Sequence, residues 1–238
     1  MALKNKTILL TGASKGIGKA LSLKLAEQTL NIGLIARSEN ELNELKTEIE
    51  RLGSKCLIFV GNVADESLAK TAVSEMMAAF GSIDFMINNA GYGIFGQTES
   101  ISSSDWSAIF DVNVKGTFLF SKEVLPGMKA AKSGHIINIA SDVAKRVFDG
   151  GGLYCASKYA QDAFSSALRK EVRKDGIKVS VVYSGLVDTM FHDQPQGAES
   201  HATWLKAEDM ANTIIYIMDQ PRHVVIDELM IHPLSQEY

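Results

Sequence analysis

The chain has 238 residues, of which 46% are hydrophobic and 22% are charged, and its formal net charge is −4. This composition supplies enough apolar material for one sizeable core, and the weak negative charge gives no reason to expect a nucleic acid or a membrane surface as partner. No apolar run is as long as a signal peptide or a membrane span, so we expect a cytoplasmic protein. Cys56 and Cys155 stand in no metal-binding spacing, which predicts reduced thiols and no metal site.

Two kinds of segment alternate along the chain. Short apolar, β-branched runs predict strands at Thr7–Leu10, Ile32–Ala36, Lys55–Val60, Phe85–Asn88, His135–Ala140, Lys178–Tyr183 and Val224–Ile231. Amphipathic stretches predict helices at Ile17–Gln28, Asn40–Leu52, Ser67–Phe80, Trp106–Lys132, Ser157–Lys174 and Ala207–Met218, with left-handed caps at Gly53 and Gly176. Because the strands are apolar throughout and alternate with helices, we expect a parallel sheet between two helical layers, in a single domain over residues 1–238.

A glycine cluster stands between the first predicted strand and the first predicted helix. Gly12 suits a tight turn, Gly16 lets backbone N–H groups approach a pyrophosphate, and Gly18 lets the helix pack against the sheet. The helix N-terminus adds unpaired donors and a partial positive charge. Glycines also serve simple turns, but this placement predicts a dinucleotide-binding loop.

The end of the second predicted strand bears on which dinucleotide binds. Folds that bind NAD place an acid there for the ribose 2′-hydroxyl, whereas this chain has Ala36-Arg37-Ser38. Arg37 and Lys15 can both bind a 2′-phosphate, which favours NADP(H). In the alternative interpretation, both are solvated surface cations.

Tyr154 and Lys158 are four residues apart and so share one face of a helix. An adjacent ammonium, helped by an oxidised nicotinamide, lowers a tyrosine pKa that is ordinarily about 10, so the phenol can exchange a proton with an alkoxide. Ser141 ends the fifth predicted strand, where open α/β sheets bind ligands, and its hydroxyl can bond the same oxygen. Taken alone, a Tyr–Lys pair is usually surface packing, and a serine after a strand is usually a turn or cap residue.

In their order along the chain, Thr11–Gly18, Asn88–Gly91, Asn113, Ser141 and Tyr154–Lys158 resemble the motifs of the short-chain dehydrogenase/reductase family. The resemblance covers nearly the whole chain and implies a Rossmann-type, doubly wound sheet of about seven strands. It also implies a catalytic tetrad of Asn113, Ser141, Tyr154 and Lys158. In the family the tyrosine is the acid/base, the serine orients the carbonyl, the lysine binds the nicotinamide ribose and lowers the tyrosine pKa, and the asparagine holds a water in a proton relay.

The resemblance implies a cofactor site as well. Its residues are Gly12, Ser14, Lys15, Gly16, Ile17, Gly18, Arg37, Asn62, Val63, Asn89, Ala90, Gly91, Tyr154, Lys158, Gly185, Val187 and Thr189. Asn62 replaces the aspartate that the family commonly has beside the adenine, and Ser184 replaces the proline that usually precedes Gly185. Since proline fixes its φ angle, its loss predicts a looser backbone beside the nicotinamide.

The substrate is expected over the nicotinamide, under a lid at about residues 189–205. Candidate wall residues are Tyr92, Phe95, Val143, Phe148, Met190, Phe191 and Trp204, although each could equally pack in the core or the lid. The glycines at 150–152 predict a flexible rim before Tyr154. The resemblance further implies that the helices carrying Asn113 and Tyr154 pair across a twofold axis, in a homodimer or homotetramer.

The sequence thus predicts an oxidoreductase that transfers a hydride between NADPH and a small or medium carbonyl or alcohol substrate. Two alternatives stay open. One is an NADP(H)-binding sensor or scaffold protein without turnover, and the other is an NAD-dependent alcohol dehydrogenase.

Overall fold

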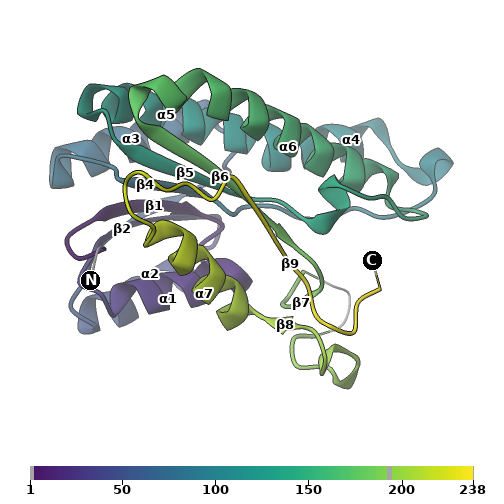
Figure 1. Ribbon diagram of the computed structural model, residues 1–238. Coiled ribbons are helices and arrows are strands. Elements are labelled where there is room, and N and C mark those ends of the chain that lie inside the picture. Colours follow the sequence, from purple (N-terminus) through teal and green to yellow (C-terminus); the bar gives the residue numbers. More distant parts are fainter. Residues whose placement is uncertain (1–2, 192–194, 238) are drawn as a thin grey trace.

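The computed structural model describes residues 3–191 and 195–237 (Figure 1). Its main sheet has seven parallel strands in the order β3-β2-β1-β4-β5-β6-β9. These strands are β1 (Thr7–Thr11), β2 (Asn31–Ala36), β3 (Lys55–Val60), β4 (Phe85–Asn88), β5 (Gly134–Ile139), β6 (Ile177–Ser184) and β9 (Glu228–Ile231). The helices are α1 (Gly16–Ala26), α2 (Glu39–Arg51), α3 (Glu66–Phe80), α4 (Ser103–Phe110), α5 (Thr117–Ala131), α6 (Gly152–Val172) and α7 (Ala207–Met218). In the described part of the chain, no helix is both long and apolar enough to cross a membrane.

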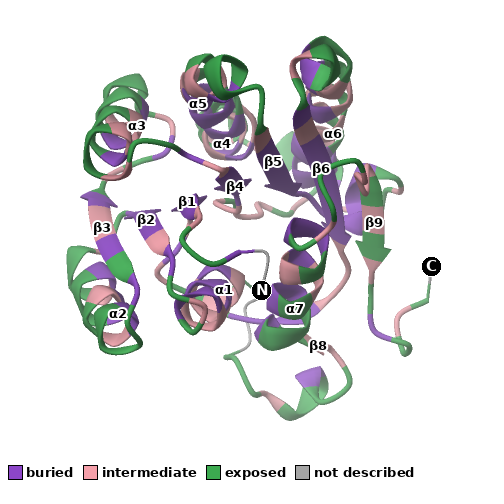
Figure 2. Ribbon diagram, turned by 60° about the vertical axis from the view of Figure 1, so that its left-hand side comes forward, coloured by how far each residue is buried: buried purple, intermediate pink, exposed green. Residues whose placement is uncertain are grey.

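Helices cover both faces of the sheet. Figure 2 shows α1, α2 and α7 on one face and α3, α4, α5 and α6 on the other. The strand order confirms the predicted doubly wound fold, because β1 and β4 are neighbours in the sheet although β2 and β3 come between them in the chain. The chain therefore leaves β1 and β4 toward opposite edges. A crevice opens at the carboxyl ends of such strands, where open α/β sheets bind ligands.

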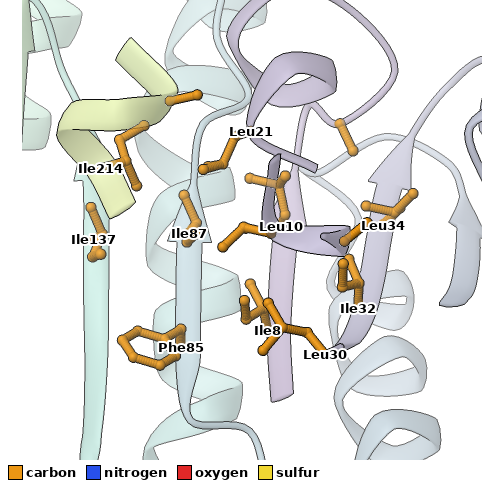
Figure 3. Close-up of a cluster of buried hydrophobic side chains, with 14 of the residues drawn as sticks. Ile8, Leu10, Leu21, Leu30, Ile32, Leu34, Phe85, Ile87, Ile137 and Ile214 are labelled. Atoms are coloured by element: carbon orange, nitrogen blue, oxygen red, sulfur yellow. The ribbon is translucent and has the colours of Figure 1, made fainter. Parts of the chain in front are cut away.

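The core beneath α1 and α7 holds the central strands rigidly. Figure 3 shows Leu10, Ile87 and Ile137 on neighbouring strands, with Leu21 of α1 and Ile214 of α7 packed above them. All five side chains are completely buried. Full burial of a side chain of this size contributes about 1.5–3 kcal/mol, so the strands form a fixed platform for the loops at their carboxyl ends.

Local signals set several helix boundaries. The Asp65 side chain accepts a hydrogen bond from Ser67 N at 2.8 Å at the start of α3, and Ser102 forms a capping box before α4. Gly53 and Gly176 have φ angles of +92° and +75°, which confirms the predicted left-handed caps.

The predicted helix Trp106–Lys132 is interrupted. It consists of α4, a π-helical turn at Asp111–Gly116, and α5. Gly116 lies against Val63, and a Cβ at this position would come within 2.8 Å of Val63 Cγ2. A π turn inserts one residue into the helix and so changes which side chains face the sheet; such turns are frequent at functional sites.

Most other element boundaries lie within a few residues of the prediction, and the starts of α6 and of the last strand differ more. α6 begins at Gly152 rather than at Ser157, so Tyr154 lies inside the helix. The last strand begins at Glu228 rather than at Val224, because Val224 N donates to Pro221 O in a turn. The apolar run that ends in β9 is therefore only partly strand.

A second, two-stranded sheet anchors the segment predicted as a lid. β7 (Val187–Asp188) pairs in parallel with β8 (Leu205–Lys206). The buried carboxylate of Asp188 accepts hydrogen bonds from Gly197 N at 2.9 Å, from His201 Nδ1 at 3.0 Å and from Lys206 Nζ at 3.0 Å. These bonds lower the pKa of Asp188 to about 2, the Gly197 amide contributing most, so the carboxylate stays ionised. Residues 192–194 of the predicted lid lie outside the described residues.

Candidate active site

Two adjoining cavities open at the carboxyl ends of the strands. The larger, which we call the long cleft, has a volume of about 700 Å³. It is lined by Gly12, Ser14, Lys15, Gly16, Ile17, Ala36, Arg37, Ser38, Glu41, Gly61, Asn62, Val63, Asn89, Ala90, Gly91, Tyr92, Gly93, Val112, Thr189, Met190 and Phe191. The smaller, which we call the inner pocket, has a volume of about 290 Å³. It is lined by Ile17, Asn89, Gly91, Phe95, Ile139, Ala140, Ser141, Asp142, Val143, Arg146, Phe148, Tyr154, Lys158, Ser184, Gly185, Leu186, Val187, Thr189, Phe191 and Gln236.

The glycine loop between β1 and α1 forms the floor of the long cleft. Gly12 has a φ of +65°, and a Cβ there would lie 2.8 Å from Ala90 Cα. A Cβ on Gly18 would collide with the Gly12 carbonyl, so this residue serves packing and does not line the cleft. Asn89 Nδ2 donates to the carbonyls of Thr11 and Gly12 at 3.1 and 3.0 Å, which joins the loop to the end of β4. No described side chain caps the N-terminus of α1, so its amides are available to an anion.

Charged side chains gather at the β2 end of the long cleft. Arg37 is exposed there, and Lys15 forms an ion pair with Glu41, with Nζ and Oε1 2.9 Å apart. The sequence predicts no acid at this end, since β2 itself ends without one. The structure brings Glu41 in from the first turn of α2. Asn62 and Val63 line the same cleft, as predicted.

Tyr154 lies in the first turns of α6 and faces the inner pocket. The rings of Phe95 and Phe191 lie 5.5 and 5.6 Å from the Tyr154 ring, centroid to centroid. Burial raises the pKa of Tyr154 well above its usual value, the Ser141 hydroxyl lowers it, and the negative charge of Asp142 raises it further. In the protein without cofactor, the Tyr154 phenol is therefore protonated at neutral pH.

Lys158 is buried one helical turn after Tyr154. Its Nζ donates to Ile139 O at 3.1 Å and to Gln161 Oε1 at 3.0 Å, and it lies 6.0 Å from the centroid of the Tyr154 ring. Burial lowers the pKa of Lys158 to about 8. A Cβ on Gly91 would come within 3.5 Å of this ammonium, so the glycine keeps the space beside Lys158 open toward both cavities.

Asn113 lies on the π turn and is completely buried. Its Oδ1 accepts from Tyr92 N at 3.1 Å, and its Nδ2 donates to Tyr92 O and to Ser157 Oγ, both at 3.0 Å. The amide thereby joins the loop after β4 to α6. Asn113 does not line either cavity. A Cβ on Gly91 would come within 3.2 Å of its Oδ1 and 3.5 Å of Lys158 Nζ, so the glycine leaves room for both groups.

Ser141 follows β5 at the wall of the inner pocket. Its hydroxyl lies 3.1 Å from Asp142 Oδ1 and 3.3 Å from Ser184 O, both acceptors. The buried Asp142 is in turn held by Arg146, whose Nε and Nη2 donate to Oδ2 at 2.9 and 2.6 Å. Gln236 Nε2 donates to the same oxygen at 2.6 Å.

The profile of the short chain dehydrogenase family matches residues 6–199. The chain belongs to this family. An uncharacterised oxidoreductase of Staphylococcus epidermidis is 32% identical over 97% of this chain and 98% of its own length. The alcohol dehydrogenase of the archaeon Thermococcus sibiricus, solved with 5-hydroxy-NADP, is 27% identical with a TM-score of 0.93, over 99% of each chain. A metagenomic short-chain oxidoreductase solved with NADP is also 27% identical, with a TM-score of 0.86, over 99% of this chain and 100% of the other.

Membership of the short chain dehydrogenase family makes this chain an oxidoreductase built to hold a nicotinamide dinucleotide, and the long cleft fits such a group. Its floor is glycine backbone that a Cβ would fill, it ends at an uncapped helix N-terminus, and it carries Lys15 and Arg37 at one end. At the other end it adjoins the inner pocket, with which it shares Ile17, Asn89, Gly91, Thr189 and Phe191. The residues present would hold the adenosine end at the cations and the nicotinamide end beside Tyr154.

Two hydrogen bonds hold the turn that follows β6. Gly185 N donates to Ile231 O at 2.8 Å, and Leu186 N donates to Gln236 Oε1 at 2.9 Å. β9 and the C-terminal segment thus contact this turn, while the looser backbone expected from Ser184 stays a prediction. Gly185, Val187 and Thr189 line the inner pocket.

The predicted substrate residues divide between the cavities. Phe95, Val143, Phe148 and Phe191 line the inner pocket, whereas Tyr92 and Met190 line only the long cleft. Trp204 is brought to neither, because its ring stacks on His201 with centroids 3.8 Å apart.

Sequence reasoning missed four charged or amide side chains that line these cavities: Glu41, Asp142, Arg146 and Gln236. Asp142 had a usable signal, since it directly follows Ser141. Gln236 had none, because the contact joins residues that are 94 positions apart in the chain.

Proposed function

We propose that this protein reduces carbonyl compounds with NADPH and that Tyr154 delivers the proton. The proposal is carried by one observation: Tyr154, Ser141 and Lys158 all line the inner pocket, which adjoins the long cleft. A carbonyl in that pocket lies between a hydroxyl pair and the cofactor's end of the cleft. When bound, the cofactor supplies the hydride.

The side chains divide the remaining work. The hydroxyls of Ser141 and Tyr154 bind the carbonyl oxygen, and Tyr154 gives its proton to that oxygen as negative charge develops. The Lys158 ammonium stabilises the phenolate that remains, and it binds the ribose beside Gly91. Asn113 holds the loop after β4 against α6. The proton-relay role rests on the family resemblance alone, since Asn113 lines neither cavity.

The preference for NADPH rests on Lys15 and Arg37 at the β2 end of the cleft. A guanidinium binds phosphate in a forked geometry, and a second cation adds charge. The archaeal alcohol dehydrogenase and the metagenomic oxidoreductase were both solved with NADP-type cofactors, which supports the same choice.

The substrate we propose is a small or medium carbonyl compound with an apolar body. Phe95, Phe148 and Phe191 line the inner pocket, and the Phe95 ring lies 5.9 Å from that of Phe148 and 6.4 Å from that of Phe191. Asp142 and Arg146, which both line this pocket, form an ion pair, so their charges neutralise each other. The three aromatic rings on one side of the pocket favour a substrate with an apolar body.

The decisive experiment replaces Tyr154 with phenylalanine. We expect Tyr154→Phe to lower kcat for NADPH-dependent reduction of a carbonyl panel by about 10²–10⁴ or more, since the proton donor is lost. Tyr216→Phe is the matched control, because Tyr216 is exposed on α7 and lines neither cavity. NADPH oxidation is followed by absorbance. Full turnover by Tyr154→Phe would rule out the assigned mechanism.

The same panel separates the alternatives. A sensor or scaffold protein binds NADPH tightly and turns over no substrate, whereas an NAD-dependent alcohol dehydrogenase oxidises alcohols with NAD in preference to NADP.

We also propose that the protein acts in the cytoplasm as a homodimer or homotetramer. Exposed aromatic side chains on the helices around Asn113 and Tyr154 support an association surface: Trp106 on α4, Phe118 on α5 and Tyr159 on α6. Light scattering of the purified protein tests the oligomeric state.

A further inference from the structure

Glu41 is the one acid among the residues that line the β2 end of the long cleft. It lies in the first turn of α2, close to Ser14 and Ser38. Lys15 Nζ lies 2.9 Å from Glu41 Oε1, whereas Glu41 Oε2 is shielded from solvent and has no hydrogen-bond partner among the described residues. A shielded carboxylate oxygen without a donor costs free energy, so its position calls for an explanation.

A purely structural role explains only part of this arrangement. An acid in the first turn of a helix is stabilised by the helix dipole. The Lys15 side chain, however, is 59% exposed, and such surface ion pairs contribute little to stability. Burial by itself would raise the pKa of Glu41, but the ion pair with Lys15 outweighs burial and lowers it. The cleft wall therefore carries a negative charge at neutral pH.

This charge acts on the two nicotinamide cofactors in opposite ways. To bind Lys15, the 2′-phosphate of NADPH must replace Glu41 as its ion-pair partner. The phosphate then lies close to the carboxylate, whose repulsion offsets part of the attraction by Lys15 and Arg37. The ribose 2′-hydroxyl of NADH instead offers a proton that the carboxylate can accept, because the Glu41 side chain lines the cleft and is 32% exposed. In NAD-binding folds, an acid at the end of the second strand accepts the hydrogen bond of the ribose 2′-hydroxyl. Here the acid lies instead in the first turn of α2.

We propose that Glu41 is a specificity-determining residue that pairs with Lys15 in the free protein and narrows the preference for NADPH over NADH. The inference rests on the proposed function, since it concerns the cofactor of that same site. It predicts a protein that uses both cofactors, with NADPH favoured by a modest margin.

Binding of each cofactor to the full-length protein tests the inference without measuring turnover. The dissociation constants of NADPH and NADH are obtained from the fluorescence of the bound nicotinamide. Glu41→Gln is expected to bind NADPH about five- to tenfold more tightly and NADH about threefold more weakly. Glu44→Gln removes the same charge from an exposed position on α2 that does not line the cleft, and it should leave both constants within about twofold.

Glu41→Ala must shift the two constants in the same opposite directions, because alanine cannot donate a hydrogen bond to the phosphate as glutamine can. Equal effects of Glu41→Gln on both cofactors, or weaker binding of NADPH, would overturn the inference and leave the proposed function standing. If the wild-type protein binds neither cofactor, the proposed function fails and the inference fails with it.

Discussion

Burial acts in opposite directions on the two titratable side chains at the inner pocket. It raises the pKa of Tyr154, because a phenolate is poorly solvated there, and it lowers the pKa of Lys158 to about 8, because an ammonium is poorly solvated too. In the free protein both residues are thus biased toward their neutral forms. In the proposed mechanism, Lys158 stabilises the Tyr154 phenolate only while its ammonium is charged, so the protonation state of Lys158 limits the proposed proton transfer.

This bias predicts a pH dependence of carbonyl reduction. Since the pKa of Lys158 is lowered to about 8, the ammonium is present below that pH and is lost as the pH rises through it. The value of kcat/KM reports the ionisations of the free enzyme, so it should fall above about pH 8. Lys158→Met should lower kcat/KM by about 10²-fold or more and abolish this limb. Steady-state rates between pH 6 and pH 10 check the prediction, and a wild-type profile that stays flat to pH 10 would contradict it.

At the residue scale, the sequence was sufficient where chemistry depends on short spacing. Tyr154 and Lys158 are one helical turn apart, and the glycine loop is contiguous, so both could be predicted and both line the cavities. Glu41 could not, because an acid in the first turn of a helix is ordinary on electrostatic grounds alone. Only the path of the chain from β2 into α2 brings it to Lys15.

At the scale of elements, the C-terminal segment joins two loops of the inner pocket. Through Gln236 it is hydrogen-bonded to Asp142 after β5 and to Leu186 after β6. Asp142 also contacts the Ser141 hydroxyl, so the segment braces the wall on which the proposed carbonyl-binding serine lies. Gln236 fills the space beside Gly185, where a Cβ would collide with its amide oxygen.

Removing this brace should affect turnover more than cofactor binding. In Gln236→Leu, Leu186 N and the Asp142 carboxylate each lose a partner, which should lower the free energy of unfolding by about 1–3 kcal/mol. We expect kcat to fall about tenfold, because Ser141 is held less firmly. The Kd of NADPH should stay within about twofold, since Gln236 does not line the long cleft. Glu237→Leu, at an exposed neighbour, is the control. A variant that loses stability but keeps wild-type kcat would show that Gln236 serves stability alone.

The elements themselves were predictable to the extent that periodicity reports them. The strands of the main sheet were found because they are apolar throughout, and their alternation with helices predicted that they are parallel. Their doubly wound arrangement was implied only by the family resemblance. The π turn at Asp111–Gly116 was missed because a single extra residue hardly alters a 3.6-residue pattern. The short strands β7 and β8 were missed because two-residue strands carry no periodicity. In the sequence, the buried Asp188 at the end of β7 looks like an ordinary loop acid.

At the scale of the whole molecule, one buried histidine links the stability of the sheet to pH. His135 lies on β5, and its Nε2 is 2.7 Å from Ser180 Oγ on β6. The Ser180 hydroxyl donates to Ile226 O at 2.6 Å, so its oxygen accepts the hydrogen bond from His135 Nε2–H. His135 is therefore a hydrogen-bond donor in its neutral form. Burial, helped by the charge of Lys178, lowers the pKa of His135 from 6.5 to about 3. Between about pH 3 and pH 6.5, His135 is therefore neutral in the folded protein and protonated in the unfolded chain.

The sign of the effect follows from this difference. Below about pH 6.5 the unfolded chain binds a proton at His135 and the folded protein does not, so stability falls as the pH decreases toward about 3. The slope from this residue reaches about 1.4 kcal/mol per pH unit. His135→Gln should remove that slope, because a glutamine amide can donate to Ser180 without titrating, whereas His223→Gln, at an exposed position, should leave it. Chemical denaturation between pH 7 and pH 5 isolates the effect, since ordinary carboxylates titrate below this window. If His135→Gln kept the wild-type slope, the acid sensitivity would have to originate at another residue than His135.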